Sequence, residues 1–241
     1  MNEELQSYFN NINLNNQIIY DIGANIGDMI LFFDKYSKNS NIIGIEPHPY
    51  NIIELERKFK GKSNIKIVHG AVNSFNGDCY VGFEQQQRIN GLKQGHVMDN
   101  ETDLQGRKWL QGTNVKSYKL DDFCKNASII KMDIEGFEHN LLYDSLPHLN
   151  HVKNWLIEIH SWEDLDYHGW TIKNHDKKKD SLNKMIKLFM ENGYRQFIFA
   201  KRRRIQKPIN EHFYWTDVPI SSYMQNNKRV YYKVVNLIIK K

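Results

Sequence analysis

The sequence predicts an α/β domain with a mostly parallel, seven-stranded sheet flanked by helices. Three observations support this prediction. Short apolar runs alternate with amphipathic segments of helical period, as expected for strands joined by helices that cross over a sheet. A glycine-containing turn follows the first apolar run, and acidic residues end several later runs. In an open sheet of this kind ligands bind where the carboxyl ends of the strands meet, so these acids are candidate site residues.

The first third of the chain predicts three strands and two helices. The apolar runs at 17–22, 42–45 and 65–68 have the length and the β-branched content of strands. A helix is expected at 29–36, directly after the glycine turn. Residues 51–59 carry apolar side chains at helical spacing and predict a second helix.

The same alternation resumes near the middle of the chain. Strands are predicted at 128–133, 155–159 and 196–199, with a helix at 138–143 between the first two. Another helix is expected between Ser181, a good N-cap residue, and Gly193, a good terminator. The β-rich segment 229–239 is expected to close the sheet or pack on its edge.

Two polar stretches without periodicity, 85–112 and 162–180, do not predict regular structure. The first is too long for a plain connection and is expected to be a functional or mobile loop. The second carries Trp162, Tyr167 and Trp170, and it fits either a lid over the site or a surface loop pinned by buried aromatic side chains.

Composition indicates a globular protein of the cytoplasm. The 241 residues are 40% hydrophobic and 25% charged, no run is long enough to span a bilayer, and the polar start does not resemble a signal peptide. Cys79 and Cys124 are too few for a disulfide framework or a zinc site, and we expect both to be buried thiols. Much of the net charge of +5 comes from two basic clusters, 177–179 and 201–204, so an anionic partner would meet a patch.

The first motif is the stretch Asp21-Ile22-Gly23-Ala24-Asn25-Ile26-Gly27-Asp28, where the first strand becomes a helix. Glycines allow the backbone to approach a ligand closely, and the helix N-terminus offers free N–H groups. A pyrophosphate-binding turn normally has the spacing G-x-G-x-x-G, and an acid at position 21 would repel it. The same acid suits the cationic end of S-adenosylmethionine, which favours that cofactor over NAD.

Two later segments complete the expected cofactor site. Glu46, followed by Pro47, ends the second strand, where a carboxylate can accept both ribose hydroxyls of an adenosine. Ala71 and Val72 follow the third strand, and their backbone could meet the adenine edge. The alternative is an ordinary doubly wound fold with a surface Glu46.

The second motif lies at the ends of the fourth and fifth strands. Strand alternation places Lys131 and Asp133 on one side of the sheet, and it places Glu158 and His160 together on the next strand. A methyl acceptor would have to sit at this edge. His160 is the first candidate for a general base because imidazole titrates near neutral pH, Asp133 is the second, and Lys131 could orient either the acceptor or a carboxylate. Alternatively, His160 is a hydrogen-bonded core residue, and Glu135 and Glu138 satisfy helix N-terminal donors.

Taken together, these motifs resemble the FkbM family of S-adenosylmethionine-dependent methyltransferases, over about residues 17–160. The first motif matches D-x-G-A-N-x-G-D, and Glu46-Pro47 matches the E-P pair of the family. Residues 120–123 match L-D-D-hydrophobic, and residues 131–138 match K-x-D-x-E-G-x-E. The C-terminal third departs from the pattern, which leaves the acceptor open.

The resemblance implies a class I (Rossmann-like) methyltransferase fold, S-adenosylmethionine as cofactor, and O-methylation, often of a sugar hydroxyl. We therefore expect a single domain over 1–241, with a cofactor-binding half at about 17–160 and acceptor-side loops and sheet closure at about 161–241. Related sugar O-methyltransferases hold a divalent metal with acids at comparable strand ends, so a Mg²⁺ site at Asp133 and Glu158 is conceivable. The acceptor is expected to be a small molecule or glycan, and an anionic one would suit the basic clusters. The alternatives are RNA as acceptor, through the same clusters, and a non-catalytic binding module.

Overall fold

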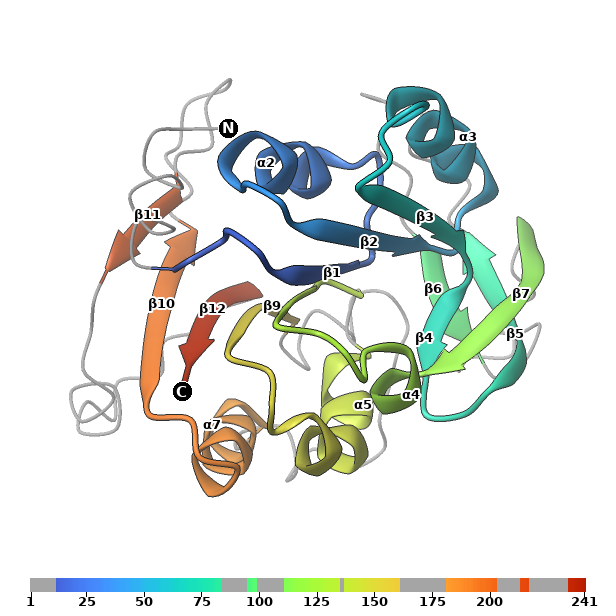
Figure 1. Ribbon diagram of the computed structural model, residues 1–241. Helices are drawn as coiled ribbons and strands as arrows, with labels where there is room; N and C mark the ends of the chain where they lie inside the picture. The colour runs from blue at the N-terminus through green and yellow to red at the C-terminus, as the bar shows by residue number, and fades with distance from the viewer. Residues whose placement is uncertain are drawn as a thin grey trace, which may run out of the picture.

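The computed structural model describes residues 12–83, 95–98, 111–134, 137–160, 181–202, 213–216 and 234–241 (Figure 1). Within these residues the main sheet has eight strands in the order β11-β10-β12-β9-β8-β1-β2-β3. The four pairings from β3 across to β9 are parallel, and those that involve β12 and β11 are antiparallel. The strands are β1 (Ile18–Ile22), β2 (Asn41–Glu46), β3 (Ile65–His69), β8 (Ile129–Met132), β9 (Asn154–His160), β10 (Gln196–Arg202), β11 (Phe213–Thr216) and β12 (Val234–Lys240).

Two details of the sheet differ from the sequence-based expectation. The predicted count of seven strands is one too low, because the short strand β11 extends the sheet beyond β10. The C-terminal strand β12 does not lie on an edge but between β9 and β10, antiparallel to both. Its apolar run therefore reflects a strand with a neighbour on either side.

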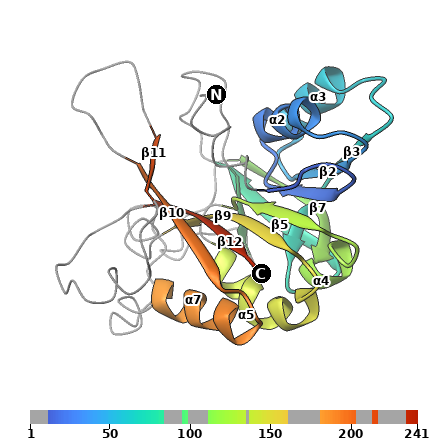
Figure 2. The ribbon, with the colours of Figure 1, turned by 60° about the vertical axis from the view of Figure 1, so that its left-hand side comes forward.

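Helices cover both faces of the sheet, as predicted (Figure 1 and Figure 2). The alternation of side chains along each strand explains this arrangement, because successive residues of a strand point to opposite faces of the sheet. Ile19 packs in the core under the first group of helices, and Tyr20 and Ile22 pack in the core under the second group. The first group is α2 (Asp28–Tyr36) and α3 (Pro49–Lys58); the second is α4 (Leu120–Phe123), α5 (Glu138–Ser145) and α7 (Ser181–Glu191).

A second sheet corrects the expectation of an irregular loop over 85–112. It has the order β4-β7-β5-β6, and both β6 (Gly95–Met98) and the start of β7 (Gln111–Lys119) fall in that stretch. The other two strands are β4 (Ala71–Asn73) and β5 (Gly77–Phe83). The sequence conceals these strands because their core is small, consisting of Ala71, Cys79, Val81 and Val115, and so requires no long apolar run.

The two cysteines are free and buried, as expected. The segment 162–180, for which a lid or a pinned loop is expected, lies outside the described residues. So do Glu135, Gly136 and the lysine cluster 177–179. No helix in the described part of the chain is both long and apolar enough to cross a membrane.

The strand order reverses at one position along the edge of the sheet. The chain runs outward from β1 through β2 to β3, and then returns to β8 and β9 on the other side of β1. The carboxyl ends of β1 and β8 therefore adjoin where the order reverses, which is where ligands bind in doubly wound folds. The first motif begins at the end of β1, and the second motif spans the end of β8, so both lie at this point.

Candidate functional site

The glycine turn after β1 is the tightest part of the site. Gly23, Asn25 and Gly27 all have positive φ values, of 74°, 49° and 84°. A Cβ atom on Gly23 would lie 1.9 Å from the carbonyl oxygen of Asp133, so only glycine lets the turn pass this close to the end of β8. Ala24 is buried, and the N–H groups of Gly23 and Ala24 both donate to Ile45 O at 3.0 Å.

Glu46 connects the end of β2 to this turn. Its carboxylate is buried, with 4% of the residue exposed, and its Oε2 accepts from the N–H of Asn25 at 2.9 Å. Oε1 accepts from the N–H of His48 at 3.0 Å and from Asn51 Nδ2 at 3.1 Å. Burial raises the pKa of Glu46, and these three donors oppose that shift. The surface alternative for Glu46 is therefore wrong.

Lys131 extends from β8 to the start of the turn. It is the direct neighbour of Asp21 in the β1–β8 register, and its Nζ lies 3.1 Å from Asp21 Oδ1. The same Nζ donates to Gly23 O at 2.9 Å and lies 3.9 Å from Asp133 Oδ2. Although burial lowers the pKa of Lys131, the charges of Asp21 and Asp133 outweigh this effect and raise it above the ordinary value. Lys131 is therefore a fixed cation shared between the ends of two strands.

Two buried acceptor oxygens remain unused beside the turn. Asp21 is fully buried, and its Oδ2 has no hydrogen-bond partner among the described residues; the same holds for Asn25 Oδ1. Burial raises the pKa of Asp21, and the Lys131 ammonium opposes this shift. Buried acceptors are costly to leave unpaired, so the site suits a ligand that brings N–H or O–H donors.

The acids of the second motif lie on the same side of the sheet as this turn. Asp133 and Lys131 point the same way, as alternation predicted, and 28% of the Asp133 side chain is exposed. Glu158 is half-buried and near enough to contribute to the raised pKa of Lys131. His160 is the last residue of β9, opposite Val234 of β12, but its side chain is outside what the structure describes.

Glu138 bonds to the backbone ahead of α5; that it satisfies helix N-terminal donors stays a prediction. It is fully buried in the first turn of α5, and its Oε1 accepts from the N–H of Ile134 at 3.1 Å. This bond fixes the backbone that follows Asp133. Among the described residues, no group of three or more His, Cys, Asp or Glu side chains is placed to hold a metal ion.

The remaining cofactor candidates lie on the β2 and β3 side. Pro47 is half-buried, and its carbonyl oxygen lies 3.1 Å from His69 Nε2. Ala71 and Val72 form part of β4 rather than a loop, and their side chains pack into apolar cores, which leaves only their backbone for a ligand. Asp78 is exposed on β5 and pairs with Lys116 at 2.8 Å.

Sequence reasoning missed the residues that hold the motif residues in place. His48 and Asn51 donate to Glu46, and Lys58 donates to the turn. A faint signal exists for Asn51, because a polar residue five positions after a strand-end acid falls in the first turn of the next helix. For Lys58 no local signal exists, since the adjacent Arg57 is an equally plausible cation from the sequence alone.

These features define an α/β protein with a glycine turn, a buried Asp21–Lys131 ion pair and unused acceptor oxygens at the switch point of its sheet. The FkbM methyltransferase domain family matches residues 21–196, a span that includes every residue of both motifs. The chain belongs to the FkbM methyltransferase family. It is therefore a methyltransferase with S-adenosylmethionine as its cofactor, and the predicted class I (Rossmann-like) fold is confirmed.

Comparisons with other proteins add only distant likenesses. None of the curated proteins compared with the chain matches it in sequence. A precorrin-6y C5,15-methyltransferase from Geobacter metallireducens is 11% identical, with a TM-score of 0.40 over 93% of this chain and 80% of that one. A Methanococcus jannaschii fibrillarin pre-rRNA processing protein is 10% identical, with a TM-score of 0.47 over 95% and 68%. Aeropyrum pernix fibrillarin, solved with bound S-adenosyl-L-methionine, is 10% identical, with a TM-score of 0.46 over 99% and 72%. Such remote likeness says nothing about the methyl acceptor.

Proposed function

We propose that the protein is an S-adenosylmethionine-dependent O-methyltransferase that methylates a sugar hydroxyl of a glycan, glycolipid or nucleotide sugar. The observation that carries the proposal is the partly exposed carboxylate of Asp133, which lies 3.9 Å from the Lys131 ammonium at the switch point of the sheet. A carboxylate held there can accept a hydrogen bond, or a proton, from an acceptor hydroxyl. The family resemblance supports a sugar as the source of that hydroxyl.

The cofactor is assigned to the glycine turn and the strand ends beside it. The unused oxygens of Asp21 and Asn25 suit the ammonium end of the cofactor, and Glu46 suits the ribose hydroxyls because ribose can share its oxygens with the N–H donors already there. Gly23 and Gly27 allow close approach of the backbone. The full assignment is Asp21, Gly23, Ala24, Asn25, Gly27, Glu46, Pro47, Ala71, Val72 and Asp133.

When bound, the cofactor supplies an electrophilic methyl group. The chain must hold the acceptor hydroxyl in line with the methyl carbon and the sulfur, and it must remove the hydroxyl proton. We assign the removal of this proton to His160 first and to Asp133 second. Lys131 is not a proton acceptor, because its raised pKa keeps it charged; its part is to orient Asp133 and the turn. Glu158 lies on the same side of the sheet, where its carboxylate can accept a hydrogen bond from the acceptor.

The expected Mg²⁺ ion is given no step in this mechanism, because the described residues include no group of three side chains placed to bind a metal. Activity with Mg²⁺ and with EDTA tests it directly. Undiminished transfer in EDTA would remove the Mg²⁺ site at Asp133 and Glu158, whereas loss of transfer that Mg²⁺ restores would establish a metal requirement.

RNA is the second candidate acceptor, and the basic clusters 177–179 and 201–204 favour it. The same clusters would equally suit the phosphates of a nucleotide sugar or of an anionic glycan. The experiment is transfer of labelled methyl from S-adenosylmethionine into a fractionated cell extract by the purified protein. Label in carbohydrate or nucleotide sugar supports the proposal, and label in RNA or protein instead would overturn it.

The role of His160 can be tested with a control from the same region of the chain. His160→Ala is expected to lower turnover at least tenfold, because a positioned general base contributes about 10²–10⁴-fold, and to leave the Kd for S-adenosylhomocysteine unchanged. His151→Ala, an exposed histidine ahead of the amino end of β9, should behave as wild type. Near-normal turnover of the His160 variant would transfer the base role to Asp133.

A further inference from the structure

Helix α3 is linked to the glycine turn at both of its ends, through Glu46 at its start and by direct packing near its end. At its start, Asn51 holds Glu46, whose Oε2 accepts from the N–H of Asn25 in the middle of the turn. At its end, Leu55 packs so closely on Gly27 that a Cβ atom there would lie 2.7 Å from Leu55 Cδ2. The helix is therefore placed to hold the turn between two points of contact.

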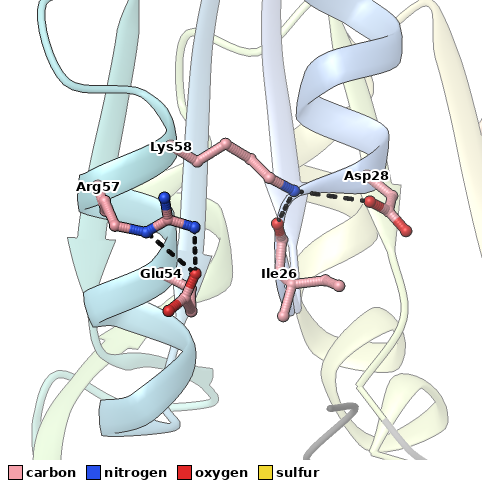
Figure 3. Close-up of polar contacts among 5 residues, drawn as sticks. All are labelled: Ile26, Asp28, Glu54, Arg57 and Lys58. Atoms are coloured by element: carbon pink, nitrogen blue, oxygen red, sulfur yellow. Dashed lines mark hydrogen bonds and ion pairs between the residues drawn. The ribbon is translucent and has the colours of Figure 1, made fainter. Parts of the chain in front are cut away.

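Lys58 is the polar part of the second contact (Figure 3). Its Nζ donates to the carbonyl oxygen of Ile26 at 2.5 Å and lies 3.7 Å from Asp28 Oδ1. The Lys58 side chain is 27% exposed, whereas that of the adjacent Arg57 is 73% exposed. Figure 3 shows Arg57 bonded to Glu54 of its own helix, while Lys58 reaches across to α2. Of these two neighbouring cations, only Lys58 joins α3 to the turn.

The bond from Lys58 completes the anchoring of one peptide plane. The peptide group between Ile26 and Gly27 has its N–H bonded to Ala24 O at 2.8 Å and its C=O bonded to Lys58. Gly27 then takes a φ of 84° and leads into the first turn of α2. With both polar groups of the plane paired, the direction of the N–H groups at the start of α2 is fixed. Those groups are the ones that a helix N-terminus offers to a ligand.

We propose that Lys58 is a positioning residue that preorders the cofactor turn. This inference rests on the assignment of S-adenosylmethionine to that turn. Loss of the lysine leaves the Ile26 carbonyl to water and frees the Ile26–Gly27 peptide to rotate, so that binding must order the turn at its own cost. Lys58 acts on the affinity for the cofactor and has no part in the removal of the acceptor proton.

The test compares Lys58→Met with Arg57→Met. Both variants remove one cation from the last turn of α3, so the effects of net charge and of the helix dipole are matched. We expect Lys58→Met to raise the Kd for S-adenosylhomocysteine, measured by calorimetry on fully folded protein, about 5- to 30-fold, as for the loss of an interaction worth about 1–2 kcal/mol. Arg57→Met should change it less than about twofold, within the range of a surface pair. Lys58→Arg, which keeps a donor, should recover most of the affinity.

Hydrogen exchange of the ligand-free protein gives a readout independent of the cofactor. Amides of residues 24–29 should exchange faster in Lys58→Met than in Arg57→Met. Equal Kd values in the two variants, or faster exchange without a change in Kd, would overturn the positioning role. A folded wild type that fails to bind S-adenosylhomocysteine would overturn the cofactor assignment, and the positioning role with it. A fall in kcat at unchanged KM for S-adenosylmethionine would also contradict the proposal.

Discussion

Replacing Gly23 with alanine tests whether the glycine turn really presses against the end of β8. The added Cβ would lie 1.9 Å from Asp133 O, where contacts below 3.0 Å essentially do not occur. The chain must therefore open by about 1 Å at a place where interiors are close-packed. Gly61 offers a matched control, because its φ of 83° is close to the 74° of Gly23 but a Cβ atom added there would have nothing within 4 Å.

The magnitudes follow from this pairing. Alanine at a positive φ costs roughly 1–2 kcal/mol, and that is the whole expected loss for Gly61→Ala. Gly23→Ala carries the same cost plus an overpacking term of roughly 1–3 kcal/mol. Urea unfolding should therefore show the larger loss at position 23, and melting temperatures should fall by roughly 2–4 °C per kcal/mol in a chain of this size.

Binding should separate the two variants further. Gly61→Ala should bind S-adenosylhomocysteine as wild type does, while Gly23→Ala should lose at least about tenfold in affinity, because the displaced turn carries the proposed ligand contacts. If the two variants lose equal stability and both bind normally, the close approach of Gly23 to Asp133 is refuted.

Two further predictions concern buried polar groups. Burial raises the pKa values of Asp21 and Glu46 above their ordinary 3.8 and 4.5, so the folded state favours their protonated forms. Their contribution to the stability of the fold therefore grows as the pH falls through the raised values. The affinity for S-adenosylhomocysteine should fall over the same range, because binding needs the carboxylates. Calorimetry from pH 8 down to the lowest pH at which the protein stays folded checks this, and a Kd constant over that whole range would contradict it. Tyr194→Phe removes the hydroxyl that accepts from Trp155 Nε1 at 2.9 Å and donates to Val152 O at 2.7 Å, so urea unfolding should show a loss of about 1–3 kcal/mol. Unchanged stability would mean that water replaces the hydroxyl.

The Asp21–Lys131 pair changes how the first motif is understood. From the sequence, Asp21 is an acid that suits a cationic ligand, and Lys131 could orient either the acceptor or a carboxylate. In the structure Lys131 lies closer to Asp21 than to Asp133, at 3.1 Å against 3.9 Å. The acid beside the cofactor turn is thus already half-neutralised. One of its oxygens remains for a ligand.

Local sequence was enough to establish the class of protein and the residues around the turn. Positive φ values at Gly23, Asn25 and Gly27 suit glycine and asparagine, so the residue types at these positions reveal the turn. Strands buried on both faces likewise need apolar runs, which is why β1, β2, β8 and β9 could be predicted. The family match over 21–196 includes the residues of the turn.

Which side chains meet depended instead on the packing of the folded chain. Lys131 reaches Gly23 across 108 positions of sequence, and Lys58 reaches Ile26 across 32. Such pairs are formed by the packing of whole elements, and a long flexible side chain carries no local mark of its partner. The second sheet could not be predicted for a related reason, because its strands bury a core of only four residues and leave little apolar pattern. Local geometry can therefore be predicted from the sequence, whereas the contacts that hold the site together form only when the fold brings distant elements close to one another.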